Sequence, residues 1–171
     1  MNLKEHIRSI PDFPKPGILF YDISTLLMNG KAWEHAVNAL AEGIAKEKPD
    51  RILGIESRGL MVAAAVAYKL GCGFAMIRKK NKLPGPVISH AYALEYGQDI
   101  IEVQADAVLK GQKIVLVDDL LATGGTMEAA ITLIKKLGGD VKLAAFIIEL
   151  TFLNGSKKLH VPQMSLLQYD S

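Results

Sequence analysis

Cysteine is almost absent from this 171-residue sequence, which contains only Cys72. One cysteine cannot form an internal disulfide, so the chain does not fit the class of secreted domains that depend on disulfides, and a reducing compartment is favoured. No paired histidine signature accompanies Cys72. We therefore interpret it as a small buried hydrophobe rather than a nucleophile.

A strong charge of either sign is also lacking, since 20 basic and 18 acidic residues give a net charge of +2. That balance does not indicate a nucleic-acid or membrane partner. No apolar run approaches the roughly 18 residues of a membrane span. The N-terminal "MNLKEHIRSI" lacks the apolar centre of a signal peptide. We expect a cytoplasmic protein with no nucleic-acid and no membrane partner.

Half of the residues are hydrophobic, which suffices for one folded domain spanning residues 1–171. Four unbroken apolar runs are typical of strands covered on both faces of a parallel sheet: 52–55, 74–77, 114–117 and 143–150. Apolar residues at helical spacing predict helices between them, at 33–44, 60–70 and 127–137. The helix at 60–70 is apolar nearly all round, so we expect it to be largely buried. The alternation predicts an α/β fold, a parallel twisted sheet flanked by helices.

Two regions interrupt this alternation. Residues 10–25 contain three prolines and Gly17, so a regular element is not expected there. Residues 79–98 are basic at first and then rich in turn residues. A loop of this length in a compact domain is usually functional or mobile.

The stretch "IVLVDDLLATGGT", residues 114–126, carries the clearest functional signal. If 114–117 is a central parallel strand, its carboxyl end faces the crevice where such sheets bind ligands. The small residues 123–126 would offer backbone N–H groups, two hydroxyls and a helix dipole to a phosphate. Asp118 and Asp119 would repel a phosphate but can accept hydrogen bonds from neighbouring sugar hydroxyls. The sequence therefore predicts a ribose-5-phosphate site.

The alternative is an ordinary strand–turn–helix connection with Asp at the turn and Thr as the helix N-cap. Other phosphate and metal motifs are missing. The sequence has no G-x-x-x-x-G-K-[ST], no G-x-G-x-x-G after a strand, no H-E-x-x-H and no paired cysteines.

The same stretch closely resembles the phosphoribosyl-pyrophosphate motif of type I phosphoribosyltransferases. Five further segments resemble the adenine-specific members of that family, in matching order along nearly the whole chain: "DFPKPGILFYDIS" (12–24), "GIESRG" (54–59), "IRKKNKLPGP" (77–86), "YALEYG" (92–97) and "SLLQYD" (165–170). The resemblance implies a parallel sheet flanked by helices, with residues about 1–30 forming a hood over the base site. Tyr21 departs from the pattern, because several relatives carry Arg there.

The resemblance also implies roles for single residues. Asp118 and Asp119 would hold the ribose hydroxyls, with the 5-phosphate bound by Ala122, Thr123, Gly124, Gly125 and Thr126. Arg58 and Lys79 would contact the pyrophosphate, Lys79 from its own or a neighbouring subunit. From the sequence alone, other interpretations stay open for two of these residues: Arg58 could be a solvated charge at a helix start, and Lys79 could be part of a solvated loop.

The base would be held by the hood. Leu19 and Phe20 would present backbone groups and an apolar face to adenine, with Leu120 on its other face and Tyr96 nearby. Glu95 would be the catalytic proton acceptor. From the pattern alone, Leu19 and Phe20 could equally be core residues, and Glu95 an exposed residue without a role.

The implied reaction is purine salvage, in which adenine and phosphoribosyl pyrophosphate give AMP and pyrophosphate. The resemblance further implies Mg²⁺ held mostly by substrate and water, with no protein ligand, and a homodimer. Two alternatives remain at this point: a phosphoribosyltransferase for another purine such as xanthine, and a non-catalytic regulator that senses phosphoribosyl pyrophosphate. The short, nearly neutral chain with no second domain disfavours the regulator.

Overall fold

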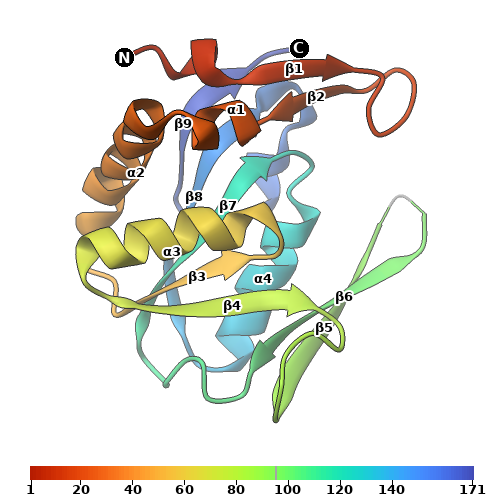
Figure 1. Ribbon diagram of the computed structural model, residues 1–171. Coiled ribbons are helices and arrows are strands. Elements are labelled where there is room, and N and C mark those ends of the chain that lie inside the picture. Colours follow the sequence, from red (N-terminus) through yellow and green to blue (C-terminus); the bar gives the residue numbers. More distant parts are fainter. Residues whose placement is uncertain (95) are drawn as a thin grey trace.

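A seven-stranded sheet forms the centre of the computed structural model, which describes residues 1–94 and 96–171 (Figure 1). Five strands run parallel: β3 (Arg51–Ile55), β4 (Gly73–Lys79), β7 (Lys113–Leu121), β8 (Asp140–Leu150) and β9 (Gln163–Tyr169). An antiparallel pair, β5 (Val87–Ala93) and β6 (Gln98–Gln104), extends the sheet at one edge. The strand order is β5-β6-β4-β3-β7-β8-β9. The four predicted strands are confirmed, and the sheet is parallel in its central part.

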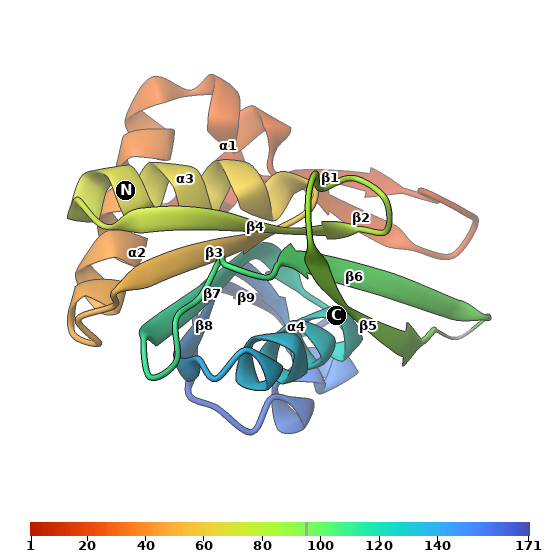
Figure 2. The same cartoon turned by 90° about the horizontal axis from the view of Figure 1, so that it is seen from below.

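Helices cover both faces of the sheet, with α2 (Gly30–Ala45) and α3 (Arg58–Leu70) on one side and α4 (Gly125–Lys136) on the other (Figure 2). Neighbouring strand residues point to opposite faces. Val117 accordingly belongs to the core under α2 and α3, whereas Leu116 belongs to the core under α4. Both are fully buried. Burial on both faces explains why the strand sequences are unbroken apolar runs.

The three predicted helices are present, but α3 is less buried than expected. One of its faces packs on the sheet, while Met61 is 47% exposed and Tyr68 is 91% exposed on the outside. The prediction of a largely buried helix was wrong because a helix in an outer layer has only one layer to pack against. The end of α3 follows the sequence, since Gly71 adopts a left-handed conformation at φ 67°.

The N-terminal region is more regular than its prolines suggested. β1 (Arg8–Pro11) and β2 (Leu19–Asp22) pair as an antiparallel hairpin, followed by the short helix α1 (Ser24–Met28). Arg8 Nη2 lies 2.5 Å from Asp22 Oδ2 and joins the two strands. The expectation of irregular structure over 10–25 is confirmed for residues 12–18, which lie in no helix or strand, and was wrong for the residues on either side. Pro11 lies at the end of a two-stranded ribbon, where its missing N–H is tolerated.

The second interruption, residues 79–98, also contains regular structure. Residues 87–93 form β5, which pairs in full with β6. The basic and turn-rich beginning of the segment hid this strand from the sequence pattern. In the described part of the chain, no helix has the length and hydropathy needed to cross a bilayer.

Candidate functional site

The acidic pair lies inside β7 rather than after it. Ile114 to Val117 form its buried beginning, and the strand continues through Asp118 and Asp119 to Leu121. The backbone N–H of Asp119 donates to Asp118 Oδ1 at 2.8 Å. Both carboxylates line one pocket at the carboxyl ends of the parallel strands, where open α/β sheets bind ligands.

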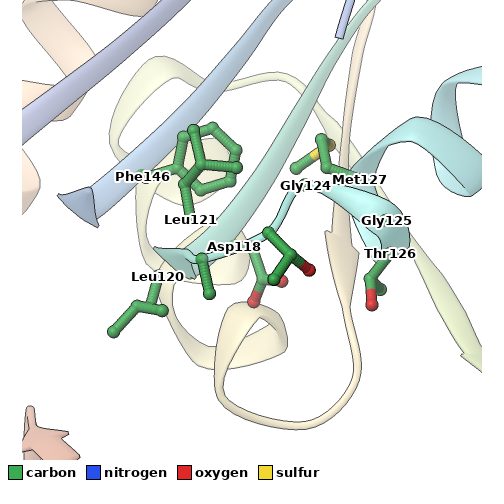
Figure 3. Close-up of a pocket in the computed structure, with 10 residues that line it drawn as sticks. Asp118, Leu120, Leu121, Gly124, Gly125, Thr126, Met127 and Phe146 are labelled. Carbon is green, nitrogen blue, oxygen red and sulfur yellow. The ribbon is translucent and has the colours of Figure 1, made fainter. Parts of the chain in front are cut away.

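The predicted anion loop, Ala122–Thr126, connects β7 to α4 and encloses a cavity of about 100 Å³ (Figure 3). Gly124 adopts φ +85°, a left-handed conformation that suits glycine. The first N–H groups of α4 have no acceptor within the helix, because intrahelical bonds begin one turn later. Together with the helix dipole, they favour an anion in this cavity.

Gly155, which the sequence analysis did not single out, supports this loop. It begins the 3-10 turn η3 (Gly155–Lys158) and is buried. A Cβ added to Gly155 would lie 2.2 Å from the Ala122 carbonyl oxygen and 2.9 Å from the Gly124 nitrogen. Only a glycine fits between this turn and the loop. The sequence "LNGSKK" gives no hint of it, because the contact joins residues more than 30 positions apart.

A second pocket, of about 290 Å³, lies beside the loop. It is bounded by residues that follow or end three neighbouring strands: Glu56, Ser57, Arg58, Lys79, Asp118, Asp119 and Thr126. Glu56 to Arg58 follow β3, Lys79 ends β4, and the acidic pair belongs to β7. The fold thus brings the predicted pyrophosphate residues and the predicted ribose residues into one space.

Arg58 is placed between the acidic pair and the N-terminal hairpin. Its Nε lies 2.7 Å from Asp119 Oδ2. That carboxylate oxygen is buried and, apart from this ion pair, has no partner among the described residues. Asp119 thus lies beside a positive charge and lines the pocket, where its carboxylate can accept a hydrogen bond from a sugar hydroxyl.

Two carboxyl groups of this pocket, Asp118 and Glu56, have pKa values shifted in opposite directions. Burial raises the pKa of Asp118 well above its ordinary value of 3.8, and the charge of Asp119 raises it further, against the opposing effect of Arg58. Burial would also raise the pKa of Glu56, but hydrogen bonds from the Lys79 backbone N–H at 2.7 Å and from Arg78 at 3.2 Å outweigh it and lower that pKa. Glu56 is thereby fixed as an anion that anchors the end of β4.

Lys79 lines the pocket of its own chain. Its Nζ contacts Asp99 Oδ2 on β6, and its side chain is 43% exposed. An ammonium group has three N–H donors, so this contact leaves Lys79 able to bind an anion in the pocket.

The N-terminal hairpin meets the site through Phe20. The guanidinium carbon of Arg58 lies 4.9 Å from the centre of the Phe20 ring, and Phe13 packs against that ring edge-on. Leu19 is 44% exposed and Leu120 is half-buried. Neither Leu19 nor Phe20 is a fully buried core residue, which leaves both accessible to a ligand.

The side chain of Tyr21, the residue after Phe20 on β2, points to the opposite face of the hairpin. It is buried, stacks on Tyr169 at 4.0 Å between ring centres, and donates its hydroxyl to the Ser171 carbonyl at 2.8 Å. Tyr96 is 81% exposed, with Lys15 of the hairpin loop 5.9 Å from its ring centre. Glu95, the predicted proton acceptor, lies outside the described residues.

Within residues 1–94 and 96–171, no cluster of three or more His, Cys, Asp or Glu side chains is arranged to hold a metal ion. The pocket carboxylates are Glu56, Asp118 and Asp119, and the first and last of these are engaged with cationic neighbours. A metal at this site would need most of its ligands from a bound substrate and from water.

Comparison with known proteins gives consistent results. Residues 25–164 match the family described as the phosphoribosyl transferase domain. A relative from Rhodospirillum centenum, named adenine phosphoribosyltransferase, is 60% identical over 171 residues and both chains are covered in full. The crystal structure of adenine phosphoribosyltransferase from Thermoanaerobacter pseudethanolicus has a TM-score of 0.95 and 48% identity, with 98% of each chain covered. The Saccharomyces cerevisiae enzyme, solved with D-2,5-dideoxy-2,5-imino-altritol 1,6-bisphosphate and adenine, has a TM-score of 0.92 and 38% identity, with 96% of each chain covered.

Proposed function

The chain belongs to the phosphoribosyl transferase family, and from this premise we propose how its residues divide the work of the reaction. It is an enzyme that transfers a phosphoribosyl group to adenine, a reaction of purine salvage. The donor in this proposal is phosphoribosyl pyrophosphate, and the products are AMP and pyrophosphate. The single observation that carries the assignment of the residues is the position of Asp119, which lines the pocket beside the anion loop and forms an ion pair with Arg58.

The donor would be held at both of its charged ends. The loop Ala122–Thr126 would bind the 5-phosphate through its backbone N–H groups and the hydroxyls of Thr123 and Thr126. Arg58 and Lys79 border the neighbouring pocket and would bind the pyrophosphate. This arrangement fixes the anomeric carbon between the two ends, and positioning of this kind is a large part of catalysis in such transfers.

The acidic pair would act on the ribose. Asp119, which lines the pocket, would accept a hydrogen bond from a ribose hydroxyl, and Asp118 lies next to it on β7. Positive charge develops on the ribosyl group as pyrophosphate leaves and N9 of adenine attacks. A carboxylate held close to that charge stabilises the transition state more than the ground state.

Adenine would bind against the N-terminal hairpin, which we propose is the hood. Phe20 would contact one face of the base and Leu120 the other, while backbone groups near Leu19 and Tyr21 read its edge. The inward direction of the Tyr21 side chain supports backbone reading, because the residue is engaged with Tyr169 and Ser171. Glu95 as proton acceptor and Tyr96 as a neighbour of the base remain predictions.

Mg²⁺ fits the site as an ion delivered with the donor. The described residues offer no protein cage for it, and Mg²⁺ usually retains several waters and binds substrate phosphates. When bound, the ion would neutralise the pyrophosphate and polarise its leaving oxygen.

We also propose that the enzyme is a cytoplasmic homodimer. The outer face of α3 supports the dimer, because Met61 near the site-bearing end and Tyr68 near the other end of the helix both expose apolar surface. Tyr68→Glu should shift the chain to the monomeric state in light scattering coupled to gel filtration. An unchanged oligomeric state would remove this face from consideration.

Turnover with adenine, hypoxanthine, guanine and xanthine, each with phosphoribosyl pyrophosphate and Mg²⁺, tests the assignment directly. Hypoxanthine has a carbonyl and a protonated nitrogen where adenine has an amine and an acceptor, so buried polar groups would face like groups. Mismatches of this kind can discriminate by about 10⁴. Comparable use of xanthine would favour the alternative substrate, and Asp119→Asn with full activity would remove the proposed ribose role.

A further inference from the structure

The hairpin of β1 and β2 depends on other parts of the chain for its position. Its two strands form a sheet of their own, separate from the seven-stranded sheet. A two-stranded hairpin by itself is at best marginally stable in water. The place of this hairpin over the site is therefore set by the contacts that its side chains make with the rest of the protein.

Tyr21 makes two such contacts on the face of β2 opposite Phe20. Its ring centre lies 4.0 Å from that of Tyr169, with 31° between the ring planes. Its hydroxyl donates to the Ser171 carbonyl oxygen at 2.8 Å. Tyr169 is the last residue of β9, and Figure 1 shows the chain after this strand passing beside the hairpin. Tyr21 thus connects the hairpin to the end of β9.

Tyr169 is itself held in place from several directions. It pairs with Leu150 of β8, so its backbone belongs to the main sheet. The Thr151 hydroxyl donates to the carboxylate of Asp170, the next residue along the chain. Lys4, in the 3-10 turn η1 (Leu3–His6), has its Nζ 4.9 Å from the centre of the Tyr169 ring, which is a cation–π contact. The Tyr169 ring therefore offers the hairpin a fixed support.

The other face of β2 carries the groups assigned to adenine. Phe20 lies beside the guanidinium group of Arg58 at 4.9 Å, and the backbone near Leu19 and Tyr21 is proposed to read the edge of the base. Hydrogen bonds to a base need donor–acceptor distances of about 2.7–3.2 Å. A shift of the Tyr21 ring would move the adjoining peptide groups out of that range.

We propose that Tyr169 is a positioning residue for adenine: its ring holds Tyr21, and through it β2, at the distance from the base that backbone reading requires. The inference rests on the proposed function, because it assumes that the hairpin is the hood over the base. Tyr169 would act from the main sheet without touching the substrate.

The test is steady-state kinetics of the full chain with adenine, phosphoribosyl pyrophosphate and Mg²⁺. Tyr169→Leu keeps an apolar side chain but removes the ring. The KM for adenine should rise about 3- to 10-fold, which corresponds to the usual worth of an aromatic pair. The KM for the donor should stay unchanged, because the donor is assigned to the anion loop, Arg58 and Lys79. Tyr169→Phe keeps the ring and should restore the wild-type KM for adenine.

Met164→Ala is the matched control for a general loss of stability. Met164 also lies on β9, at a distance of about 16 Å from Tyr169 along the strand. It packs against α2 at Gly43, where an added Cβ would lie 2.5 Å from the Met164 Cε atom. This variant should have a lower melting temperature but the wild-type KM for adenine. An equal rise of that KM in Met164→Ala, or an equal rise of the donor KM in Tyr169→Leu, would overturn the role of Tyr169.

Hydrogen exchange of the backbone amides of residues 19–22 tests the position of the hairpin without any substrate. Exchange should be faster in Tyr169→Leu than in the wild type and in Met164→Ala. Unchanged exchange in Tyr169→Leu would overturn the role of Tyr169 alone and leave the proposed function standing. Faster exchange with an unchanged KM for adenine would overturn the role of Tyr169 together with the hood of the proposed function.

Discussion

Replacing Gly155 by alanine should damage the site through one methyl group that touches no substrate. The added Cβ would lie 2.2 Å from the Ala122 carbonyl oxygen, whereas real Cβ atoms essentially never approach a neighbour within 3.0 Å. The loop or the η3 turn must therefore move by at least 0.8 Å, the difference between these two distances. Neither partner can avoid the clash by rotating a side chain, because both contacts are made by backbone atoms.

The size of the effect follows from this displacement. Misplacement by about 1 Å can reduce a rate by about 10²-fold when positioning is central to catalysis. Forcing an extra methyl into a packed site typically costs about 1–3 kcal/mol of stability. We expect kcat/KM for phosphoribosyl pyrophosphate to fall by about 10²-fold, with a lower melting temperature but a folded protein.

The assay compares Gly155→Ala with Gly30→Ala. A Cβ at Gly30 would meet nothing within 4 Å, and its backbone is not left-handed. Gly30→Ala should therefore leave both kinetics and stability near wild-type values. Circular dichroism confirms folding, and steady-state kinetics with varied donor gives the specificity constant. A Gly155→Ala enzyme with donor kcat/KM within about twofold of wild type would refute the reasoning.

Three further predictions concern charge and base choice. Burial and the charge of Asp119 raise the pKa of Asp118 above 3.8, so the ionised group costs stability as pH rises above 3.8. Asp118→Asn should therefore have a higher melting temperature than the wild type at neutral pH and the same melting temperature below pH 3.8. An equal gain in melting temperature at the two pH values would contradict this. Burial would raise the pKa of Asp22, but hydrogen bonds from Ser24 and Arg8 lower it to about 2. Asp22→Asn should therefore reduce the free energy of unfolding by about 2 kcal/mol at neutral pH. In urea titrations this difference from the wild type should vanish as pH falls from 3.8 to 2. Tyr21→Arg should change rate or affinity modestly without changing the preferred base, and a switch to hypoxanthine in the specificity constants would disprove backbone reading of adenine.

The sequence by itself determined the local elements and the chemistry they present. Apolar runs such as 114–117 predicted buried strands, because a strand covered on both faces needs apolar side chains in both directions. The small residues of 122–126 predicted the loop before α4, since their conformational needs are set within a few neighbouring residues. These signals are local, and the structure has them where the sequence placed them.

Only the tertiary structure decided which distant residues meet. Gly155 supports the anion loop, and Tyr92 reaches Thr126 from 34 positions away, but neither residue differs in sequence from an ordinary turn glycine or strand tyrosine. The β5–β6 pair was missed for the same reason, because strand pairing depends on a partner rather than on the segment alone. The pKa of Asp118 likewise depends on burial and on the charges of Asp119 and Arg58. Asp118 becomes buried, and Arg58 comes close to it, only when β7 packs beside α3.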